Sequence, residues 1–424
     1  MLIRFLRNCR GGIAPLMGIL ALPLMGAVGV AVDFSRFNAT RTAFQAALDS
    51  TALMLAKTAA TQPAGDLQAT ATSTFKALFA HPEASNVTIT ATYSQTNGSK
   101  VTLAGNATID TNFLGVLGYS QLNISAMSVS TWGNTRLRVA LVLDNTGSMS
   151  SDNKMTALKA ASQNLLTQLK NAAVNDGDVY ISIVPFSKDV NVGAANNNEA
   201  WLRWDLWEAA NGTCSNSYYT KQSSCLSHGK IWTPASHSTW NGCVTDRDQN
   251  FDITNDAPVA GATLYPAEQY SSCPVQLMGL SYDWTALSDK INAMQPKGST
   301  NQAIGLQMGW QTLTASPFTI PPMDPNYKYK QIIILLTDGL NTQDRWYTSQ
   351  TSIDTRQQKA CDNIKAADIT IYAVQVNTDG DPTSTMLKNC ASDPGKFFLL
   401  TSSQQIVATF NQIGTALSNL RLAM

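Results

Sequence analysis

Arg138-Val-Ala-Leu-Val-Leu-Asp-Asn-Thr-Gly-Ser-Met-Ser150 is the segment from which the architecture of this chain follows, because an apolar run ends there in oxygen-bearing side chains. Val139–Leu143 is short, continuous and partly β-branched, which is typical of a strand buried on both faces of a parallel sheet. Asp144, Thr146 and Ser148 follow at alternate positions in a turn that contains glycine. One carboxylate and two hydroxyls form an all-oxygen set that suits Mg²⁺ or Mn²⁺ rather than zinc.

Two later stretches carry side chains that can complete this set. Residues 297–305 have the pattern of a turn that leads into a helix, and they offer the hydroxyl of Thr300. Residues 332–337 are a second apolar strand, and Asp338 follows it. Asp144 and Asp338 thus both end buried strands, where open α/β sheets bind their ligands. We expect the three loops to converge on one metal site.

These pieces resemble the von Willebrand factor A domain and its metal-ion-dependent adhesion site, which is written Asp-x-Ser-x-Ser, then a Thr, then an Asp. The resemblance implies a metal held by Asp144, Thr146, Ser148, Thr300 and Asp338. Thr146 replaces the usual Ser but keeps its hydroxyl. In that family a partner's carboxylate fills a free position on the metal, so the resemblance implies adhesion through Mg²⁺, or through Mn²⁺ or Ca²⁺. The alternative is a domain that keeps only the fold.

The rest of this region alternates between helical and strand-like patterns, which predicts a doubly wound, mostly parallel, Rossmann-like α/β sheet. The expected helices cover residues 156–171, 282–294, 301 onward, 353–366 and 404–422, and the expected strands 179–185, 330–337 and 369–376. An irregular segment of about 190–281 interrupts this alternation. A segment of that length inside a compact domain is usually functional or stapled by disulfides.

Cysteine usage predicts how this insertion is stapled. Six cysteines follow the apolar N-terminal segment and Cys9 precedes it, and an even number in an oxidising compartment favours three disulfides. The sequence does not fix the pairing; the most local pairs are Cys214–Cys225, Cys243–Cys273 and Cys361–Cys390. The rival interpretation is a zinc site made by Cys225, His228, His237 and Cys243.

Two other features of the insertion have alternative interpretations. The stretch from Asp246 to Asp252 resembles the start of a calcium loop, but Phe251 and Ala257 stand where an EF-hand needs Gly and Glu. We expect a solvated acidic loop instead. The tryptophans form either an exposed binding surface or the insertion's own core, and the spacing of the first three suits one face of a short helix. They are Trp201, Trp204, Trp207, Trp232 and Trp240.

Residues 13–32 are uncharged and long enough to cross a hydrocarbon core of about 30 Å as a helix. Arg4, Arg7 and Arg10 precede them and Asp33 follows, so the positive-inside rule predicts a cytoplasmic N-terminus. A secretory signal cleaved near Ala31 is the alternative. Beyond the span we expect helices over 33–57 and 67–79, and strands over 87–93, 101–109 and 122–131, with a turn at Asn97-Gly98.

Taken together, the chain resembles the TadG family of Tad (Flp, type IVc) pilus assembly proteins. The features that carry the resemblance are the Arg10-Gly-Gly leader, the anchor that ends in Val-Asp-Phe-Ser-Arg36, the small α+β module, and the A-type domain with its insertion. Prepilin processing is not expected, because Met17 stands where a prepilin has Glu. The resemblance implies a single-pass protein of the bacterial inner membrane with its bulk in the periplasm, or extracellular at a pilus tip. Its implied partners are other Tad subunits, TadE/TadF-like minor pilins, or a host-surface carboxylate.

The expected domains are a cytoplasmic N-terminus (1–12), a transmembrane helix (13–32), a TadE/TadG-like pilin-like module (33–131) and the A-type domain (136–424). Only 14% of residues are charged and the net charge is zero, which argues against nucleic acid as a partner. Enzyme chemistry is not expected either. Asp338-Gly-Leu340 lacks the hydroxyl of an aspartic-protease dyad, and the histidines, at positions 81, 228 and 237, are far from the metal loops in sequence. We predict an assembly factor or tip adhesin; the alternative is a structural anchor whose metal only stabilises the fold.

Overall fold

The computed structural model describes residues 13–56, 58–59, 62–94, 99–132, 135–325 and 327–422. These residues form two compact units, an N-terminal unit up to residue 132 and a C-terminal unit from Thr135. The leader, the arginines that precede the apolar segment, Cys9 and the Asn97-Gly98 turn lie outside the described residues.

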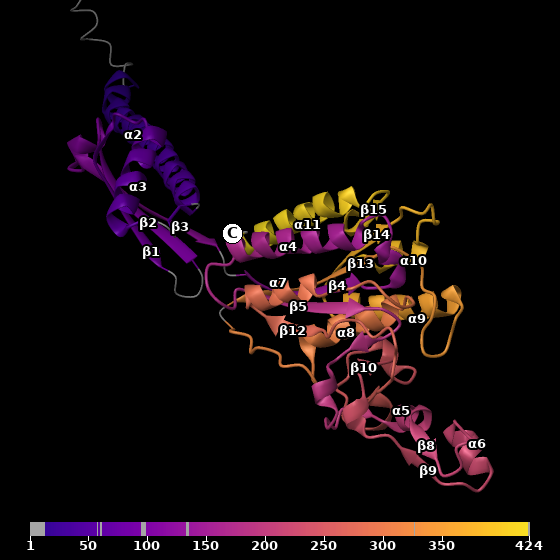
Figure 1. Cartoon of the computed structure of the whole chain (residues 1–424). Helices are drawn as coiled ribbons and strands as arrows, with labels where there is room; N and C mark the ends of the chain where they lie inside the picture. Colours follow the sequence, from indigo (N-terminus) through magenta and orange to yellow (C-terminus); the bar gives the residue numbers. More distant parts are fainter. Residues whose placement is uncertain are drawn as a thin grey trace, which may run out of the picture. The chain divides into compact units, whose positions relative to one another are not determined.

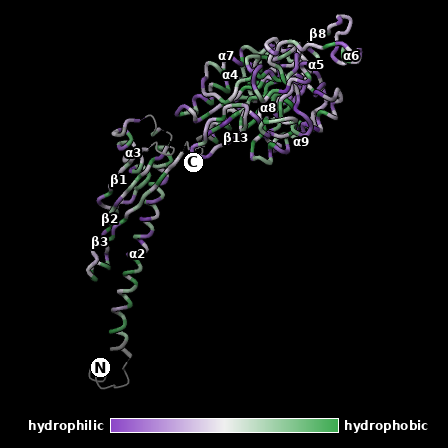
Figure 2. Tube along the Cα trace, turned by 90° about the horizontal axis from the view of Figure 1, so that it is seen from below, coloured by the Kyte–Doolittle hydropathy of each residue, from purple (hydrophilic) through white to green (hydrophobic). Residues whose placement is uncertain are grey.

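The N-terminal unit is organised on one long helix, α2 (Ile13–Ala56). Its 44 residues correspond to a length of about 66 Å. Within the described part of the chain, α2 alone is long and apolar enough to cross a membrane. Its first half is hydrophobic all round (Figure 2), and its apolar side chains there are exposed. The second half becomes amphipathic and packs on the rest of the unit through Phe44 and Leu48, both fully buried.

A three-stranded antiparallel sheet and a second helix complete this unit. The elements are α3 (Ala64–Leu78), β1 (Ala84–Ser94), β2 (Ser99–Asp110) and β3 (Gln121–Trp132), with the strands in the order β1-β2-β3. Buried and exposed residues alternate along β2, so one face packs on the helices and the other faces outward. The short helix η1 (Leu114–Leu117) lies in the connection between β2 and β3.

The C-terminal unit has a central sheet in which five neighbouring strands are parallel (Figure 1). In spatial order they are β5 (Val179–Phe186), β4 (Thr135–Asp144), β13 (Lys328–Thr337), β14 (Thr370–Val376) and β15 (Phe397–Leu400). Short antiparallel strands extend the β5 side: β6 (Val190–Asn191), β10 (Cys243–Val244) and β12 (Met278–Ser281). The predicted fold class is confirmed.

Helices cover both faces of this sheet, because alternate strand residues point to opposite sides. Leu141 and its equivalents pack on α4 (Lys154–Ala172), α7 (Trp284–Asn292) and α11 (Gln404–Leu422). Val142 and its equivalents pack on α8 (Gln302–Thr314), α9 (Gln350–Ala366) and α10 (Thr385–Cys390). The sequence analysis missed α10 and β15, which are too short to show a clear periodicity.

The insertion between β5 and α7 consists of very short elements held by covalent and aromatic contacts. They include β7 (Leu202–Arg203), α5 (Asp205–Ala210), β8 (Gly212–Cys214), α6 (Gln222–Ser227), β9 (Trp232–Pro234), η5 (Phe251–Ile253) and β11 (Tyr265–Pro266). Disulfides join the three local pairs, Cys214–Cys225, Cys243–Cys273 and Cys361–Cys390, the last outside the insertion. The zinc alternative is wrong, because both of its thiols are in disulfides.

The tryptophans form the insertion's own core rather than an exposed surface. Trp207, Trp232 and Trp240 are buried, and the Trp204 ring lies 5.5 Å from Trp207 and 5.3 Å from Trp240. The prediction of one helix face is wrong, since Trp201 lies before β7 and packs 6.2 Å from Tyr265 instead.

The acidic loop is not solvated as predicted. Asp246 and Asp252 are buried, and Asp252 forms an ion pair with Arg356 of α9. Asp248 pairs with Arg203 and Arg345. The prediction failed because the guanidinium partners come from elements up to about a hundred residues away in sequence, which local composition does not reveal.

Candidate metal centre

The candidate site lies where the strand order of the sheet reverses. β4 is the first strand of the domain, β5 follows on one side of it, and β13 is the next parallel strand on the other side. Asp144 is the last residue of β4 and Asp338 directly follows β13. The carboxyl ends of two neighbouring parallel strands therefore deliver both carboxylates to the same point, the topological switch point where such sheets bind ligands.

Four of the five predicted side chains are joined there by direct contacts. Thr146 donates hydrogen bonds to Asp144 Oδ1 from its hydroxyl (2.5 Å) and its backbone N–H (2.7 Å). Its hydroxyl lies 3.1 Å from Ser148 Oγ, which in turn donates to Asp338 Oδ1 (2.6 Å). Ser148 belongs to the short helix η2 (Gly147–Ser150), which turns its hydroxyl back toward the sheet.

The fifth residue, Thr300, lies beside the other loops through its backbone. Its N–H donates to Thr342 Oγ1 (2.8 Å), just beyond Asp338 in the chain. Two residues earlier, the Gly298 carbonyl accepts the N–H of Gly147 at 3.0 Å. Within the described residues, the Thr300 hydroxyl makes no hydrogen bond to the other four side chains. The structure thus brings the three loops together but leaves Thr300 as the outlying member of the set.

Two residues that the sequence analysis did not identify contact the carboxylates. The Thr337 hydroxyl donates to Asp144 Oδ2 at 2.6 Å. Lys154 Nζ lies 2.8 Å from Asp338 Oδ2 and 2.9 Å from Asp379 Oδ2, and the Lys154 side chain is fully buried. Lys154 is the first residue of α4, an end where the helix dipole disfavours a cation. A lysine at that position, six residues after Ser148, was the signal that could have revealed this contact.

The electrostatics of the site are dominated by burial and by the two carboxylates. Burial and the charge of Asp338 raise the pKa of Asp144 to about 7, against the hydrogen bonds from Thr146 and Thr337, which lower it. Burial alone would lower the pKa of Lys154, but its bonds to Asp338 and Asp379 raise it overall. A cation placed between the carboxylates would favour the ionised form of Asp144.

The donor chemistry fits a hard divalent cation. Asp144 and Asp338 are bridged by hydroxyl groups, and all of these atoms are oxygens, which Mg²⁺, Mn²⁺ and Ca²⁺ prefer. Nowhere in the described parts of the chain do three His, Cys, Asp or Glu side chains gather as a metal cluster. This site contains only two such groups, so hydroxyls and water would have to supply the remaining positions.

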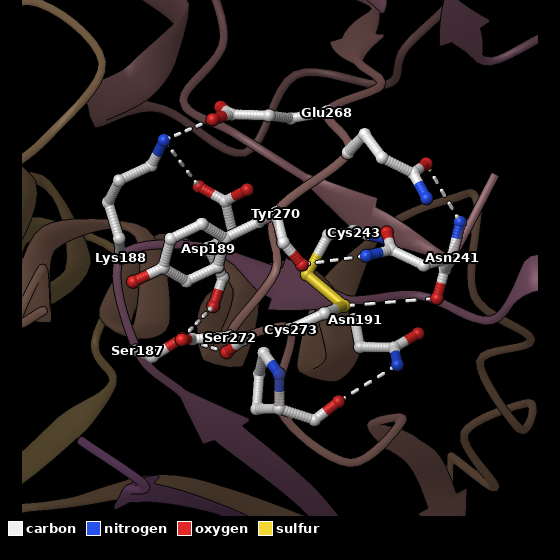
Figure 3. Close-up of a disulfide and its surroundings, with 12 residues drawn as sticks. Ser187, Lys188, Asp189, Asn191, Asn241, Cys243, Glu268, Tyr270, Ser272 and Cys273 are labelled. Atoms are coloured by element: carbon white, nitrogen blue, oxygen red, sulfur yellow. Dashed lines mark hydrogen bonds and ion pairs between the residues drawn. A yellow bond between two sulfur atoms is a disulfide. The ribbon is translucent and has the colours of Figure 1, made fainter. Parts of the chain in front are cut away.

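The insertion forms a wall beside this site. Tyr270 Oη accepts the N–H of Ser299 at 3.0 Å, and a Cβ on Gly298 would lie 2.6 Å from the same oxygen. Gly298 also has a φ of +89°, so glycine is required there for two reasons. The turn that carries Tyr270 is stapled by Cys243–Cys273. Figure 3 shows this disulfide and, on the other side of Tyr270, Lys188 with its ion pairs to Glu268 and Asp189.

Two family comparisons agree with this fold. Residues 261–412 match the von Willebrand factor type A domain, and residues 11–60 match the Flp pilus-assembly TadE/G-like family. The fold and these matches show a von Willebrand factor type A domain preceded by a helix similar to that of the TadE/G-like family. The two matches cover separate parts of the chain, the first within the C-terminal unit and the second along α2. Among curated proteins, none matches the sequence significantly.

Several solved structures are similar to this chain at low identity. The pilus adhesin SpaC from Lactobacillus rhamnosus GG is 15% identical over 81% of this chain, with a TM-score of 0.37. The von Willebrand factor domain of the type V pili tip protein Mfa5 from Porphyromonas gingivalis is 12% identical, with a TM-score of 0.39, over 68% of this chain and 97% of its own. Proximal thread matrix protein 1 from the mussel byssus, with a zinc-occupied MIDAS motif, is 13% identical over 68% of this chain and 46% of its own, with a TM-score of 0.35. This chain covers 36% of the length of SpaC.

Proposed function

We propose that this protein is a membrane-anchored assembly factor or tip adhesin of a Tad pilus that binds a protein partner through a divalent cation. The cation would be Mg²⁺, with Mn²⁺ or Ca²⁺ as alternatives. Asp144, Thr146, Ser148, Thr300 and Asp338 would hold it. The observation that carries the proposal is the continuous chain of contacts from Asp144 through two hydroxyls to Asp338 at the switch point of the sheet.

The residues of the site have separate roles in this proposal. Asp144 and Asp338 supply the negative charge, and Thr337 fixes the orientation of Asp144. Thr146 and Ser148 supply neutral oxygens, so they add no negative charge beyond that of the two carboxylates, and a position on the cation would remain for a carboxylate of the partner. Tyr270 holds the backbone of the loop that carries Thr300.

A non-enzymatic role is part of the proposal. Each histidine has another contact: His81 with Glu83, His228 with the Ser224 carbonyl and His237 with Glu208. None of these contacts involves the two strand-end carboxylates. The partner would be another Tad subunit, a TadE/TadF-like minor pilin or a surface ligand that presents a carboxylate.

The first half of α2 would be the membrane anchor. Its uncharged residues 13–32 are exposed along most of their described length, as expected of a lipid-covered helix. The arginines before it support a cytoplasmic N-terminus and a periplasmic C-terminal unit.

The alternative is a structural anchor in which the metal only stabilises the A-type domain. The two functions differ in what a folded protein without metal does. Under the adhesion proposal it loses its partner, and under the alternative it keeps the partner and only becomes less stable.

Calorimetry on a fragment that begins at Thr135 tests the site, with Mg²⁺, Mn²⁺ and Ca²⁺ titrated into wild type and Asp144→Ala. We expect saturable binding in the wild type and an affinity at least about 100-fold lower in the variant. Partner capture with and without chelator then separates the two functions. Failure of a folded wild-type fragment to bind any of the three ions would overturn the proposal.

A further inference from the structure

The connection between β2 and β3 exposes an apolar surface that the N-terminal unit does not cover. Residues 111–120 contain no charged side chain. Phe113, Val116, Leu117 and Tyr119 are 49%, 88%, 64% and 65% exposed, and η1 has no buried residue. Exposed apolar groups that gather in this way mark a contact with another molecule or with a membrane.

This connection is fixed to α2 by a single carboxylate. Asp33 is almost fully buried, and its oxygens accept the backbone N–H groups of Asn112 (3.1 Å), Phe113 (2.7 Å) and Leu114 (2.8 Å). Three hydrogen bonds to one ionisable group hold the start of η1 in a defined place along the helix. The connection therefore cannot slide along α2 without losing them.

The Phe113 ring lies one helical turn closer to the N-terminus than Asp33. It packs directly on Gly29, where a Cβ atom would come within 2.7 Å of the ring. Gly29 is four residues before Asp33, which is about 6 Å along a helix. Phe113 is thus level with the end of the uncharged segment 13–32, and not with the amphipathic half of α2.

The apolar surface of the connection is continuous with that of the helix. Leu24, Met25, Val28 and Val32 are exposed, and with Gly29 and Phe113 they line a shallow open depression. Figure 2 shows the corresponding part of α2 as hydrophobic. Whatever solvent surrounds Val28 and Val32 therefore also reaches Phe113 and its neighbours.

We infer that the β2–β3 connection is a second membrane contact, which inserts Val116, Leu117 and Tyr119 into the lipid interface of the leaflet nearest Asp33. This inference rests on the proposed membrane span of α2. Lipid is favoured over a protein partner because the exposed patch lies at the depth of a segment that lipid already surrounds. An uncharged apolar loop carrying a tyrosine also suits the boundary between headgroups and acyl chains.

The consequence is a fixed orientation of the N-terminal unit relative to the membrane. A single helix can rotate and tilt about its axis, whereas a helix with a loop inserted beside it has two points of attachment. Asp33 would then act as the joint that keeps the loop at the right depth, although it does not itself enter the hydrocarbon.

Spin labelling of the full-length protein in phosphatidylethanolamine and phosphatidylglycerol vesicles tests the inference. Single cysteines are placed at Val116, Leu24 and Lys100 in a Cys9→Ser background, and the disulfide-bonded cysteines do not react. Lys100 is exposed and lies ten residues before Asp110 on β2, about 33 Å along the strand. We expect the Val116 label, like the Leu24 label, to be more accessible to oxygen than to a water-soluble nickel reagent. Its accessibility to nickel should be several-fold lower than that of the Lys100 label.

The three labels separate the possible failures. If the Leu24 label lies in lipid but the Val116 label is as accessible to nickel as the Lys100 label, the inference is overturned and the membrane span is retained. If the Leu24 label is accessible to nickel, the membrane span is overturned, and the inference with it. A Val116 label shielded from both reagents and immobile would show a contact with another copy of the chain, and would also overturn the lipid contact.

A second variant keeps the test independent of the label at Val116. Because Val116 projects into solvent within this unit, Val116→Asp is not expected to disturb folding, but a carboxylate is costly in lipid. A label at Tyr119 should become accessible to nickel in this variant, while a label at Leu24 stays in lipid. An unchanged Tyr119 label in a folded variant would contradict insertion of the loop.

Discussion

The C-terminal unit contains two groups of buried or half-buried aspartates, and their surroundings differ. Asp144 and Asp338, at the strand ends, are contacted by hydroxyl groups and by a single ammonium, that of Lys154. Asp248 and Asp252, in the insertion, face guanidinium groups instead. Each group contains a deeply buried carboxylate, that of Asp144 in the first and that of Asp252 in the second, so acidity and burial alone do not explain the difference.

The two groups differ in whether the side chain that contacts the carboxylate still has an oxygen that can coordinate a metal. A guanidinium group matches a carboxylate with two fixed N–H donors and neutralises it, so no cation is needed. A hydroxyl donates one proton but keeps its own oxygen free to coordinate a metal. The strand-end aspartates are therefore suited to bind a cation, whereas Asp252 braces the insertion against α9 through Arg356.

The largest effect is expected from breaking this brace. Arg356→Met leaves the buried carboxylate of Asp252 without its partner, and we expect the free energy of unfolding to fall by about 3–5 kcal/mol. Chemical denaturation of the fragment that begins at Thr135 measures it. Metal affinity of the folded variant should be unchanged.

Arg345→Met is the matched control, because its partner Asp248 is 34% exposed and water can replace the lost contact. Its cost should be about 1 kcal/mol or less. Equal costs for the two variants would contradict the distinction between a buried brace and a partly exposed one.

Asp246 is buried like Asp252 but, among the described residues, its carboxylate accepts hydrogen bonds only from uncharged N–H groups. Its contribution to the free energy of unfolding should therefore depend on pH. Burial and the charges of Asp344 and Asp252 raise its pKa to about 7, although Arg345 N–H and Asn301 donate to it. The folded state then holds a proton that the unfolded chain, with an ordinary pKa of 3.8, has lost. Stability from this group is fully present below about pH 4 and is lost as the pH rises through about 7.

Asp246→Asn removes that loss, so its stability relative to wild type should be roughly 2–3 kcal/mol greater at about pH 8 than at about pH 5. Urea denaturation of the same fragment at both pH values provides the comparison. Asp176→Asn, at an exposed position, is the control and should show no such difference. A constant offset between Asp246→Asn and wild type at the two pH values would show that Asp246 is already ionised throughout.

The contrast between the strand-end aspartates and those of the insertion also explains which parts of the site could be predicted from the sequence. Asp144 and Asp338 were predictable because each ends a continuous apolar strand, and strand ends meet by the geometry of a parallel sheet. The Asp246–Asp252 loop was misjudged because its cationic partners, Arg203, Arg345 and Arg356, share no local pattern with it. Lys154 and Thr337 were missed for the same reason, since a contact between side chains of different elements leaves no periodicity.

Lys154 allows a sharper test of the strand-end group. Its ammonium competes with a metal for Asp338, so Lys154→Met should tighten divalent-cation binding by about tenfold, or about 1.4 kcal/mol. The metal-free variant should be less stable than wild type, because Asp144 and Asp338 then repel each other without compensation. Calorimetry and denaturation with and without Mg²⁺ measure both effects.

Lys170→Met, at the exposed end of the same helix, is the control and should change neither quantity. If Lys154→Met instead weakened metal binding, Lys154 would be part of the scaffold that shapes the site rather than a competitor for it.

The smallest effect is expected from Thr146→Ser, which restores the usual Ser of the adhesion-site pattern. Thr146→Ser keeps the hydroxyl that joins Asp144 to Ser148, so metal affinity should change by less than about threefold, or about 0.7 kcal/mol. Thr146→Val has nearly the same shape but removes the oxygen, and it should weaken binding by at least about tenfold. Because valine differs from threonine only by a methyl group in place of the hydroxyl, and serine keeps the hydroxyl without the methyl, calorimetry on both variants separates the role of the hydroxyl from that of the methyl group. Equal affinities for the Ser and Val variants would mean that the Thr146 hydroxyl is not a ligand, that the backbone N–H of Thr146 suffices to orient Asp144, and that the cation is held by the carboxylates, Ser148 and Thr300 alone.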